Sequence, residues 1–286
     1  MIESALSRRA FAAGAGALLA LARSRGALAA ANRLELTGSS TVAPLAAEIG
    51  KRFETLHQGI RVDVQTGGSS RGVHDARTGL ADIGMASRSL YENEHDLIAY
   101  TIALDGVTMI LHKDNPIQEL TTQQIVDIYT GKIRDWSALT SLKGTIAVEH
   151  KAEGRSTLEL FLDYFKLNAS AVRADIIVGD NQEAIKFVSG NPMAIGYVSI
   201  GAALYEADIG TPIKPLPLNG VKPTIEAVIN HTFPIIRELN LLVRSEPQGN
   251  VRDFITFAQS AAVDDLVQEL SYVPIDHKPG LQAAQR

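Results

Sequence analysis

The chain has 286 residues, 45% of them apolar, and carries a formal net charge of −5. This composition is typical of a soluble globular protein, and the length suits one large domain or two of moderate size. The chain has no cysteine, which excludes disulfides, thiolate metal sites and cysteine nucleophiles. Its acidic balance does not fit a basic nucleic-acid-binding surface.

The first 31 residues indicate an export signal. An arginine pair, Arg8-Arg9, precedes a mildly apolar run that ends at Ala22, and small residues close the segment. The run is short, rich in alanine and glycine and followed by two more arginines. These features are typical of a twin-arginine signal peptide over 1–31, with a short amphipathic helix as the alternative. No later run of about 18 apolar residues occurs, so we expect no membrane span in the mature, periplasmic chain.

Strand-like and helix-like runs alternate through the first part of the mature chain. We expect strands at 34–36, 61–65 and 82–86, and helices at about 44–56, 73–79 and 92–98. This β-α-β-α order favours a parallel sheet with helices on both faces, and therefore an α/β fold.

Two apolar strands, at 106–112 and 239–243, are spaced as a two-lobed protein requires if the chain leaves one lobe, builds a second and returns. The predicted lobe I therefore spans 32–110 plus 240–286, and lobe II spans 111–239. Within lobe II we expect helices at 122–130, 157–165 and 182–188 and strands at 145–149 and 195–198. The last helices, at 251–259 and 263–270, would rejoin lobe I.

Three predicted strand-to-helix turns share one composition: GSST at 38–41, GGSSRG at 67–72 and EGRST at 153–157. The first amides of a helix have no partner within it, and the helix dipole is positive there. Glycine lets a ligand approach, hydroxyls donate, and arginine matches an oxyanion. One such turn is explained by helix capping alone, but three predict a shared anion site at the carboxyl ends of the strands.

The second turn also matches the G-x-S-x-G pattern of a serine nucleophile, with Ser70 at its centre. An esterase would need a histidine base, and His231 and His277 follow later in the chain. Both lie in segments predicted as loop and tail, and no oxyanion-loop motif is visible. A serine esterase that uses Ser70 stays open as an alternative.

The other histidines are scattered and form no H-E-x-x-H or similar ligand pair. The segment Thr130-Gly131-Lys132 lacks the preceding glycine and the following hydroxyl of a phosphate-binding loop for ATP. We therefore expect neither a metal nor a cofactor.

Five stretches carry a family resemblance: LTGSSTVAPLA, GGSSRGVHDARTGLADIGMASRSL, LTTQQIVDIYTGKIRDWSAL, NPMAIGYVS and FPIIRELNLLV. With them, nearly the whole mature chain resembles the periplasmic phosphate-binding proteins of ABC transporters, in both order and spacing. The resemblance implies a two-lobed flytrap fold, with two α/β domains joined by a two-strand hinge. It also implies that one oxyanion is bound in the cleft between the lobes.

The resemblance further implies which residues of lobe I bind the anion. They are Ser40, Thr41, Ser70, Arg71, Ser87 and Arg88. Ser87 and Arg88 end the third strand, where many relatives carry an aspartate that accepts the proton of hydrogen phosphate. Arg88 stands at or next to that place and brings positive charge instead of an acid.

In lobe II the implied ligand-binding residues are Lys151, Glu153, Arg155, Ser156 and Thr157. The family motif there is an arginine, two variable residues and Gly-Ser-Gly-Thr. Lys151 falls where the arginine is expected, Arg155 replaces the first serine, and Ser156 replaces the glycine. Glu153 is either the remaining proton acceptor or a carboxylate that caps its own helix. If no acceptor faces the ligand, rejection of sulfate should weaken.

The sequence therefore predicts a binding protein, not an enzyme, that captures inorganic phosphate in the cleft. We expect a monomer that delivers phosphate to an inner-membrane ABC permease with its ATPase. A binding protein or sensor of the same fold for another oxyanion, such as sulfate or an organic phosphate, is the first alternative. The Ser70 esterase is the other.

Overall fold

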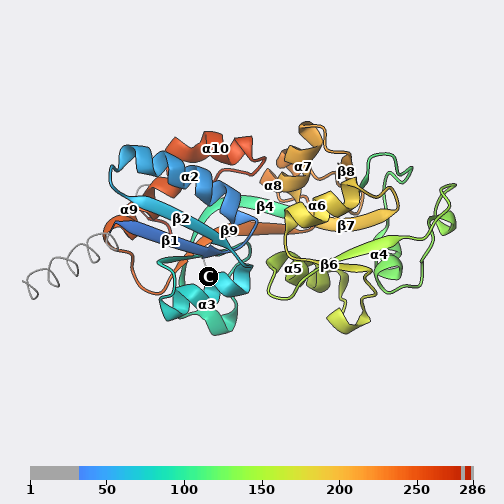
Figure 1. Ribbon diagram of the computed structural model, residues 1–286, viewed down its shortest axis with the longest axis horizontal. Helices are drawn as coiled ribbons and strands as arrows, with labels where there is room; N and C mark the ends of the chain where they lie inside the picture. Colours follow the sequence, from blue (N-terminus) through green and yellow to red (C-terminus); the bar gives the residue numbers. More distant parts are fainter. Residues whose placement is uncertain (1–31, 278–280, 285–286) are drawn as a thin grey trace, which may run out of the picture.

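The structure, a computed structural model, describes residues 32–277 and 281–284 (Figure 1). The predicted signal peptide, 1–31, lies outside the described residues. Within these ranges, no helix has the length and apolar character that crossing a membrane requires. The described chain forms two α/β lobes that lie side by side, and two long strands run through both (Figure 1).

Lobe I is built on three parallel strands: β1, Arg33–Gly38, β2, Arg61–Thr66, and β3, Ile83–Ala86. Their order is β2-β1-β3, and β3 then pairs antiparallel with β9, Ile236–Val243. One face packs on α2, Val42–Leu56, α9, Gly249–Ala258, and α10, Asp264–Glu269. The other face packs on α3, Ser69–Thr78 (Figure 1). The lobe therefore has helices on both faces of its sheet, as the sequence predicts.

Lobe II continues the same sheet in the order β4-β7-β5-β6, with β8 paired to β4. Its strands are β4, Ile98–His112, β5, Ala147–Lys151, β6, Ile176–Val178, β7, Ala194–Ser199, and β8, Ile213–Pro215. Its helices are α4, Thr122–Tyr129, α5, Ser156–Phe165, α6, Asn181–Ser189, α7, Ile200–Asp208, and α8, Ile225–Ile229. Among the described residues, 3-10 turns lie at Trp136–Ala138 and Ala169–Ala171 in lobe II and at Glu92–Glu94 and Ala261–Val263 in lobe I.

The strands β4 and β9 connect the lobes. β4 pairs with β9 up to Gly106 and with β7 from Val107 onward, so its first half belongs to one sheet region and its second half to the other. The apolar cores divide in the same place: Ala103 packs in the core of lobe I, and Val107 packs in the core of lobe II. The predicted lobe boundaries, at 110/111 and 239/240, stay a prediction.

The prediction of a helix at 92–98 is wrong. The structure has a single 3-10 turn, Glu92–Glu94, and the chain enters β4 at Ile98. The residues that follow are rich in β-branched and aromatic side chains, which favour an extended strand, and β9 pairs with them from Ile98 onward. The strand predicted at 106–112 is therefore correct but begins eight residues too late. Helix α7 was not predicted either.

Glycine places the first turn of α3 directly on the sheet. A Cβ at Gly72 would collide with the backbone oxygen of Met85 in β3, so no larger residue fits this approach. Gly68, with φ +95°, precedes the helix in a conformation that other residues rarely adopt. The glycines of GGSSRG thus explain how α3 begins, independent of any ligand.

The segment after α10 returns across lobe I to the first loop. Val273 forms a bridge with Leu104 of β4, and the buried Tyr272 hydroxyl donates to the backbone oxygen of Thr41 at 3.0 Å. The segment therefore fixes the start of α2 from behind.

Candidate functional site

The three glycine and hydroxyl turns meet between the lobes. The amide of Ser70, in lobe I, donates to the backbone oxygen of Gly154, in lobe II, at 3.2 Å. A Cβ at Gly68 would lie 2.5 Å from that same oxygen, so only glycine allows the two turns to approach this closely. The first turn joins the second through the amides of Gly67 and Gly68, which donate to the backbone oxygen of Gly38 at 2.8 and 2.9 Å. It also meets lobe II, since Asn181 Nδ2, at the start of α6, donates to Thr41 Oγ1 at 3.2 Å.

A buried arginine of β9 lies where the turns converge. Arg237 Nη1 donates to Ser87 Oγ at 3.3 Å and to Thr157 Oγ1 at 3.0 Å, and its Nη2 donates to Thr41 Oγ1 at 3.2 Å. Nε and Nη2 also donate to Oδ2 of Asp105, on β4, at 2.9 and 2.8 Å. One side chain thus holds hydroxyls from two loops of lobe I and from the first turn of α5 in lobe II.

Both carboxylate oxygens of Asp105 accept hydrogen bonds from neighbouring groups. Besides Arg237, its Oδ2 accepts from Ser199 Oγ at 2.8 Å, and its Oδ1 accepts from the amide of Gly201 at 3.1 Å. The side chains of Asp105 and Arg237 are 1% and 0% exposed. Because a buried charge is tolerated only when it is paired and hydrogen-bonded, this pair is a structural anchor at the hinge strands.

Four hydroxyl groups at this contact all act as hydrogen-bond acceptors. Thr41, Ser87 and Thr157 accept from Arg237, and Ser69 Oγ accepts from the amide of Ser87 at 3.2 Å. A hydroxyl can accept and donate at the same time, and in the described residues none of these four donates its own proton. We name Thr41, Ser69, Ser87 and Thr157 the hydroxyl cluster. Its four buried hydroxyls are linked through Arg237 and the amide of Ser87, beside the contact between the lobes, and each keeps a proton to donate.

The start of α5 adds further donors. Ser156 Oγ and Arg155 Nε are buried and have no hydrogen-bond partner in the described chain. The first amides of α5 have no partner inside the helix, and the dipole is positive there. Among the described residues, Arg155 makes no ion pair with a carboxylate, so its charge is uncompensated. Unsatisfied buried donors that lie beside a helix start are suited to an anion.

Lys151 is buried and bonds to groups outside this loop. Its Nζ lies 3.0 Å from Glu149 Oε1 and donates to the backbone oxygen of Asp180 at 2.9 Å. Burial lowers the pKa of Lys151 while Glu149 opposes that shift, and burial raises the pKa of Glu149 while Lys151 opposes it. The lysine predicted as an anion ligand is thus paired with a buried carboxylate.

Two other predicted arginines are engaged elsewhere. Arg71 donates to Asp75, to Gln65 and to the backbone of Thr66, all within lobe I. Arg88 is buried and forms ion pairs with two glutamates, described below. The structure does not bring either guanidinium to the hydroxyl cluster.

Three other predicted site residues are not part of the hydroxyl cluster. Glu153 is exposed. Ser70 is exposed as well, and no histidine bonds to it in the described residues, so the esterase alternative lacks a base there. Ser40 lines a separate hollow of about 330 Å³ that is bordered by Asp180 and Tyr272.

Sequence reasoning missed Arg237, Asp105, Ser69 and Asn181. The first two carry a readable signal, since each is a charged residue inside a largely apolar strand that crosses between lobes. Asp105 is the one acidic residue of β4, and Arg237 stands next to Glu238 in β9. Buried charges in such strands are rare unless they are paired. The pairing itself, across 132 positions of sequence, leaves no local trace.

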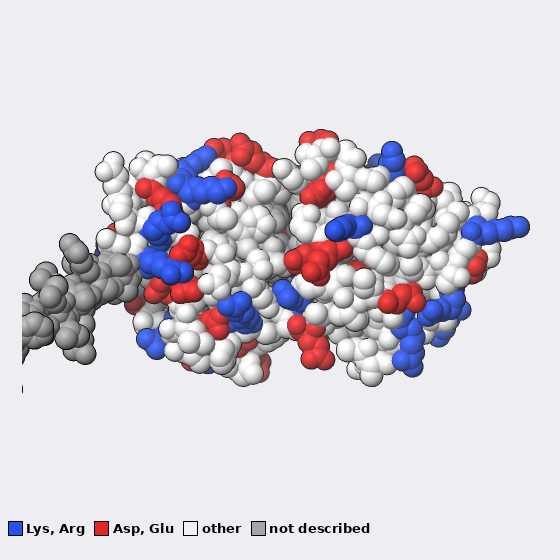
Figure 2. All heavy atoms as spheres, in the orientation of Figure 1, with Lys and Arg blue, Asp and Glu red and all other residues white. Residues whose placement is uncertain are grey.

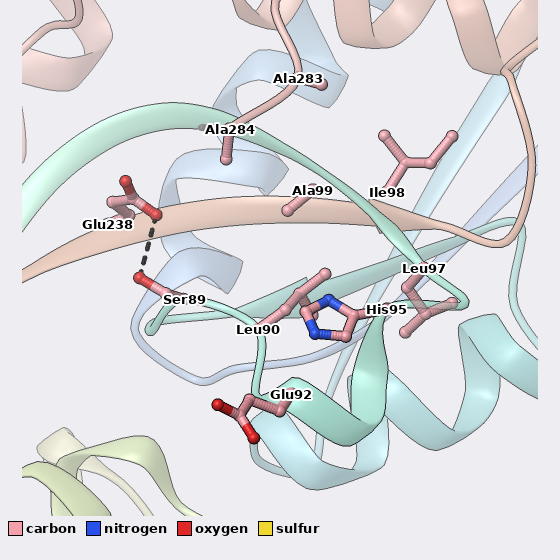
Figure 3. Close-up of a pocket in the computed structure, with 10 residues that line it drawn as sticks. All are labelled: Ser89, Leu90, Glu92, His95, Leu97, Ile98, Ala99, Glu238, Ala283 and Ala284. Carbon is pink, nitrogen blue, oxygen red and sulfur yellow. Dashed lines mark hydrogen bonds between the residues drawn. The ribbon is translucent and has the colours of Figure 1, made fainter. Parts of the chain in front are cut away.

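A cavity of about 350 Å³ lies apart from the hydroxyl cluster, on the lobe I side (Figure 3). Its walls are mostly apolar, with Leu90, Leu97 and Ile98 among them, and Glu238 accepts a hydrogen bond from Ser89 at its edge. No hydroxyl of the cluster lines it, so it is not part of the candidate site.

Comparison with known proteins gives one consistent result. A family model described as a PBP superfamily domain matches residues 25–262. A substrate-binding protein of Clostridium perfringens, assigned to phosphate ABC transport and solved with bound phosphate, is 29% identical, with a TM-score of 0.79 over 86% of this chain and 100% of that chain. An ABC-type phosphate transport receptor of Vibrio cholerae is 27% identical, with a TM-score of 0.69 over 84% and 99%.

The phosphate-binding protein PstS of Bacillus subtilis is 24% identical over 252 residues, which cover 86% of this chain and 82% of that protein. These matches confirm the predicted two-lobed flytrap fold and the predicted resemblance to phosphate-binding proteins. The chain belongs to the PBP superfamily.

Proposed function

We propose that the protein captures inorganic phosphate between its lobes and delivers it to an ABC permease. The observation that supports this most is the hydroxyl cluster, in which four O–H groups from both lobes converge without an acceptor of their own. A tetrahedral oxyanion offers several acceptor oxygens in a small volume, which is what such a cluster requires. The names of the relatives, which are binding and transport proteins rather than enzymes, agree with this function.

Local groups, rather than the overall field, hold the anion. Acidic and basic side chains are interspersed over the face that Figure 2 shows, and the chain as a whole is acidic. Attraction must therefore come from Arg155, from the start of α5 and from the O–H donors. Because these donors come from both lobes, the bound anion favours the closed form, and closure would be a hinge motion at β4 and β9.

Another tetrahedral oxyanion is the second candidate, for one specific reason. No unpaired carboxylate is in contact with the hydroxyl cluster in the described residues, since Asp105 already accepts four hydrogen bonds. A ligand proton then has no dedicated acceptor. Discrimination between hydrogen phosphate and sulfate should be weaker than in a site with a free carboxylate.

We further propose that the twin-arginine route exports the chain across the inner membrane. There it would act as a monomer and deliver the anion to a permease in that membrane. The names of relatives in phosphate ABC transport support this setting.

Isothermal titration of residues 32–286 with phosphate, arsenate and sulfate tests the proposal. We expect saturable heat with phosphate and arsenate and measurable, weaker binding of sulfate. Thr157→Val, which removes one O–H donor and keeps the shape, should lower phosphate affinity about tenfold. Thr55→Val, at an exposed position of α2, is the matched control and should leave it unchanged. Absence of phosphate binding by the unaltered protein would overturn the proposal.

A further inference from the structure

Arg88 links the two lobes instead of facing the anion. It donates from Nη1 and Nη2 to both carboxylate oxygens of Glu94, at 2.7 and 2.9 Å, within lobe I. Its Nε donates to Glu159 Oε2, on α5 of lobe II, at 2.9 Å. The Arg88 side chain is 5% exposed, and those of Glu94 and Glu159 are 9% and 27% exposed. This contact is thus a largely buried ion pair across the cleft.

Tyr91 completes the contact. Its ring lies under the Arg88 guanidinium, 3.7 Å from Cζ to the ring centroid, and its hydroxyl donates to Glu159 Oε2 at 2.9 Å. Burial and then the charge of Glu159 raise the pKa of Tyr91 to about 12, so the phenol keeps its proton at any physiological pH. Glu159 Oε2 therefore receives two donors from lobe I, and both are lost if the lobes separate.

The contact is closely connected to the hydroxyl cluster. Ser87 directly precedes Arg88, and Glu159 follows Thr157 by two residues in the first turn of α5. Asn240 of β9 also donates to the backbone oxygen of Arg88, at 3.0 Å. The ion pair thus joins the loop that carries one O–H donor to the helix turn that carries another.

Apolar packing holds this segment only in part on its other side, where the partly buried Leu90 packs against a small apolar cluster of lobe I. Ser89, Leu90 and Glu92 line the 350 Å³ cavity, and Figure 3 shows Leu90 and His95 at its border and Ser89 bonded to Glu238. A segment beside a cavity has fewer packing contacts than a filled core provides. The ion pairs of Arg88 therefore add to the positioning that this partial packing gives.

We propose that Glu159 is a positioning residue that, through Arg88 and Tyr91, holds the lobes closed and aligns the start of α5 with the hydroxyl cluster. This inference rests on the proposed anion binding. Glu159 stabilises the closed form before the anion contributes and slows its release afterwards. Arg88 thereby has a role other than the ligand contact that the sequence predicts.

Glu159→Gln tests the proposal, with Asp163→Asn as the matched control. Asp163 lies on the same helix, is 82% exposed and pairs only with Lys166 in the described chain. In stopped-flow release and calorimetry with phosphate, Glu159→Gln should raise Kd about tenfold, mostly through a faster release rate. Tyr91→Phe, which removes one of the two donors, should raise Kd about threefold. Asp163→Asn should stay within twofold of the unaltered protein.

A second measurement needs no ligand. Because the chain has no cysteine, Lys51→Cys in lobe I and Lys143→Cys in lobe II give two unique, exposed labelling sites. Spin-label distances without phosphate should shift toward longer values in Glu159→Gln and stay unchanged in Asp163→Asn. An unchanged distance distribution together with an unchanged release rate would overturn the role of Glu159. If the proposed anion binding is wrong, calorimetry of the unaltered protein will show no phosphate binding. The spin-label distances, measured without phosphate, would still test the role of Glu159.

Discussion

Replacement of Arg237 by methionine should affect stability and binding by separate, calculable amounts. The substitution removes the guanidinium and leaves Asp105, whose side chain is 1% exposed, without its charge partner. Removing one member of a buried pair costs about 3–5 kcal/mol, a large part of the total stability of about 5–15 kcal/mol that domains have. Urea denaturation should show this loss. Asp105→Asn in the same chain should recover part of it, because it removes the uncompensated charge.

The second calculable effect of Arg237→Met is the loss of phosphate affinity. Thr41, Ser87 and Thr157 each lose a hydrogen bond from Arg237, and Thr41 keeps only the one from Asn181. Three hydrogen bonds at about 1 kcal/mol each predict a loss of about 3 kcal/mol, which is about a hundredfold in the Kd for phosphate. Calorimetry on variants whose circular dichroism shows a folded chain measures it. A Kd within about threefold of the unaltered protein would refute the view that Arg237 organises the donors.

Further predictions concern single side chains. Ser156→Ala removes a buried hydroxyl that has no partner in the described residues, so phosphate affinity should fall about tenfold in calorimetry while the melting temperature stays the same or rises. Arg71→Ala should leave phosphate affinity unchanged, since Asp75 and its neighbours engage the guanidinium; a loss beyond threefold contradicts the structure. Burial, followed by the charge of Lys151, lowers the pKa of His150 to about 4. Because the unfolded chain takes up this proton near pH 6.5 and the folded chain only near pH 4, up to about 3 kcal/mol of stability should be lost as pH falls through that window. Urea titrations of His150→Gln at several pH values should show a flatter dependence.

The sequence predicts the three turns but not the partners to which their arginines bond. Glycine and hydroxyl residues that end a strand and begin a helix are a local pattern, and the structure brings all three turns together. Where a guanidinium points depends on its nearest carboxylate, which the local pattern does not show. Asp75 engages Arg71 from one turn further along α3, and Glu159 reaches Arg88 from 71 positions away.

The fold is easier to predict than the site for the same reason. Alternation of strands and helices is a property of neighbouring residues, and it indicates a two-lobed α/β protein before any contact is known. The anchor of the site is a pair of buried charges from the two connecting strands, and that pair exists only in three dimensions. An apolar strand that contains a single charged residue, such as β4 with Asp105, is a sequence signal for such an anchor.

The return of Tyr272 to the first loop has a practical consequence for anyone building a sensor from this protein. A reporter fused at the carboxyl end must leave the segment through Tyr272 undisturbed, because its hydroxyl braces the backbone of Thr41 from outside the cleft. Trimming the chain back to the end of α10 would loosen that brace and blunt the optical response to the anion, even though no residue that faces the anion had been touched.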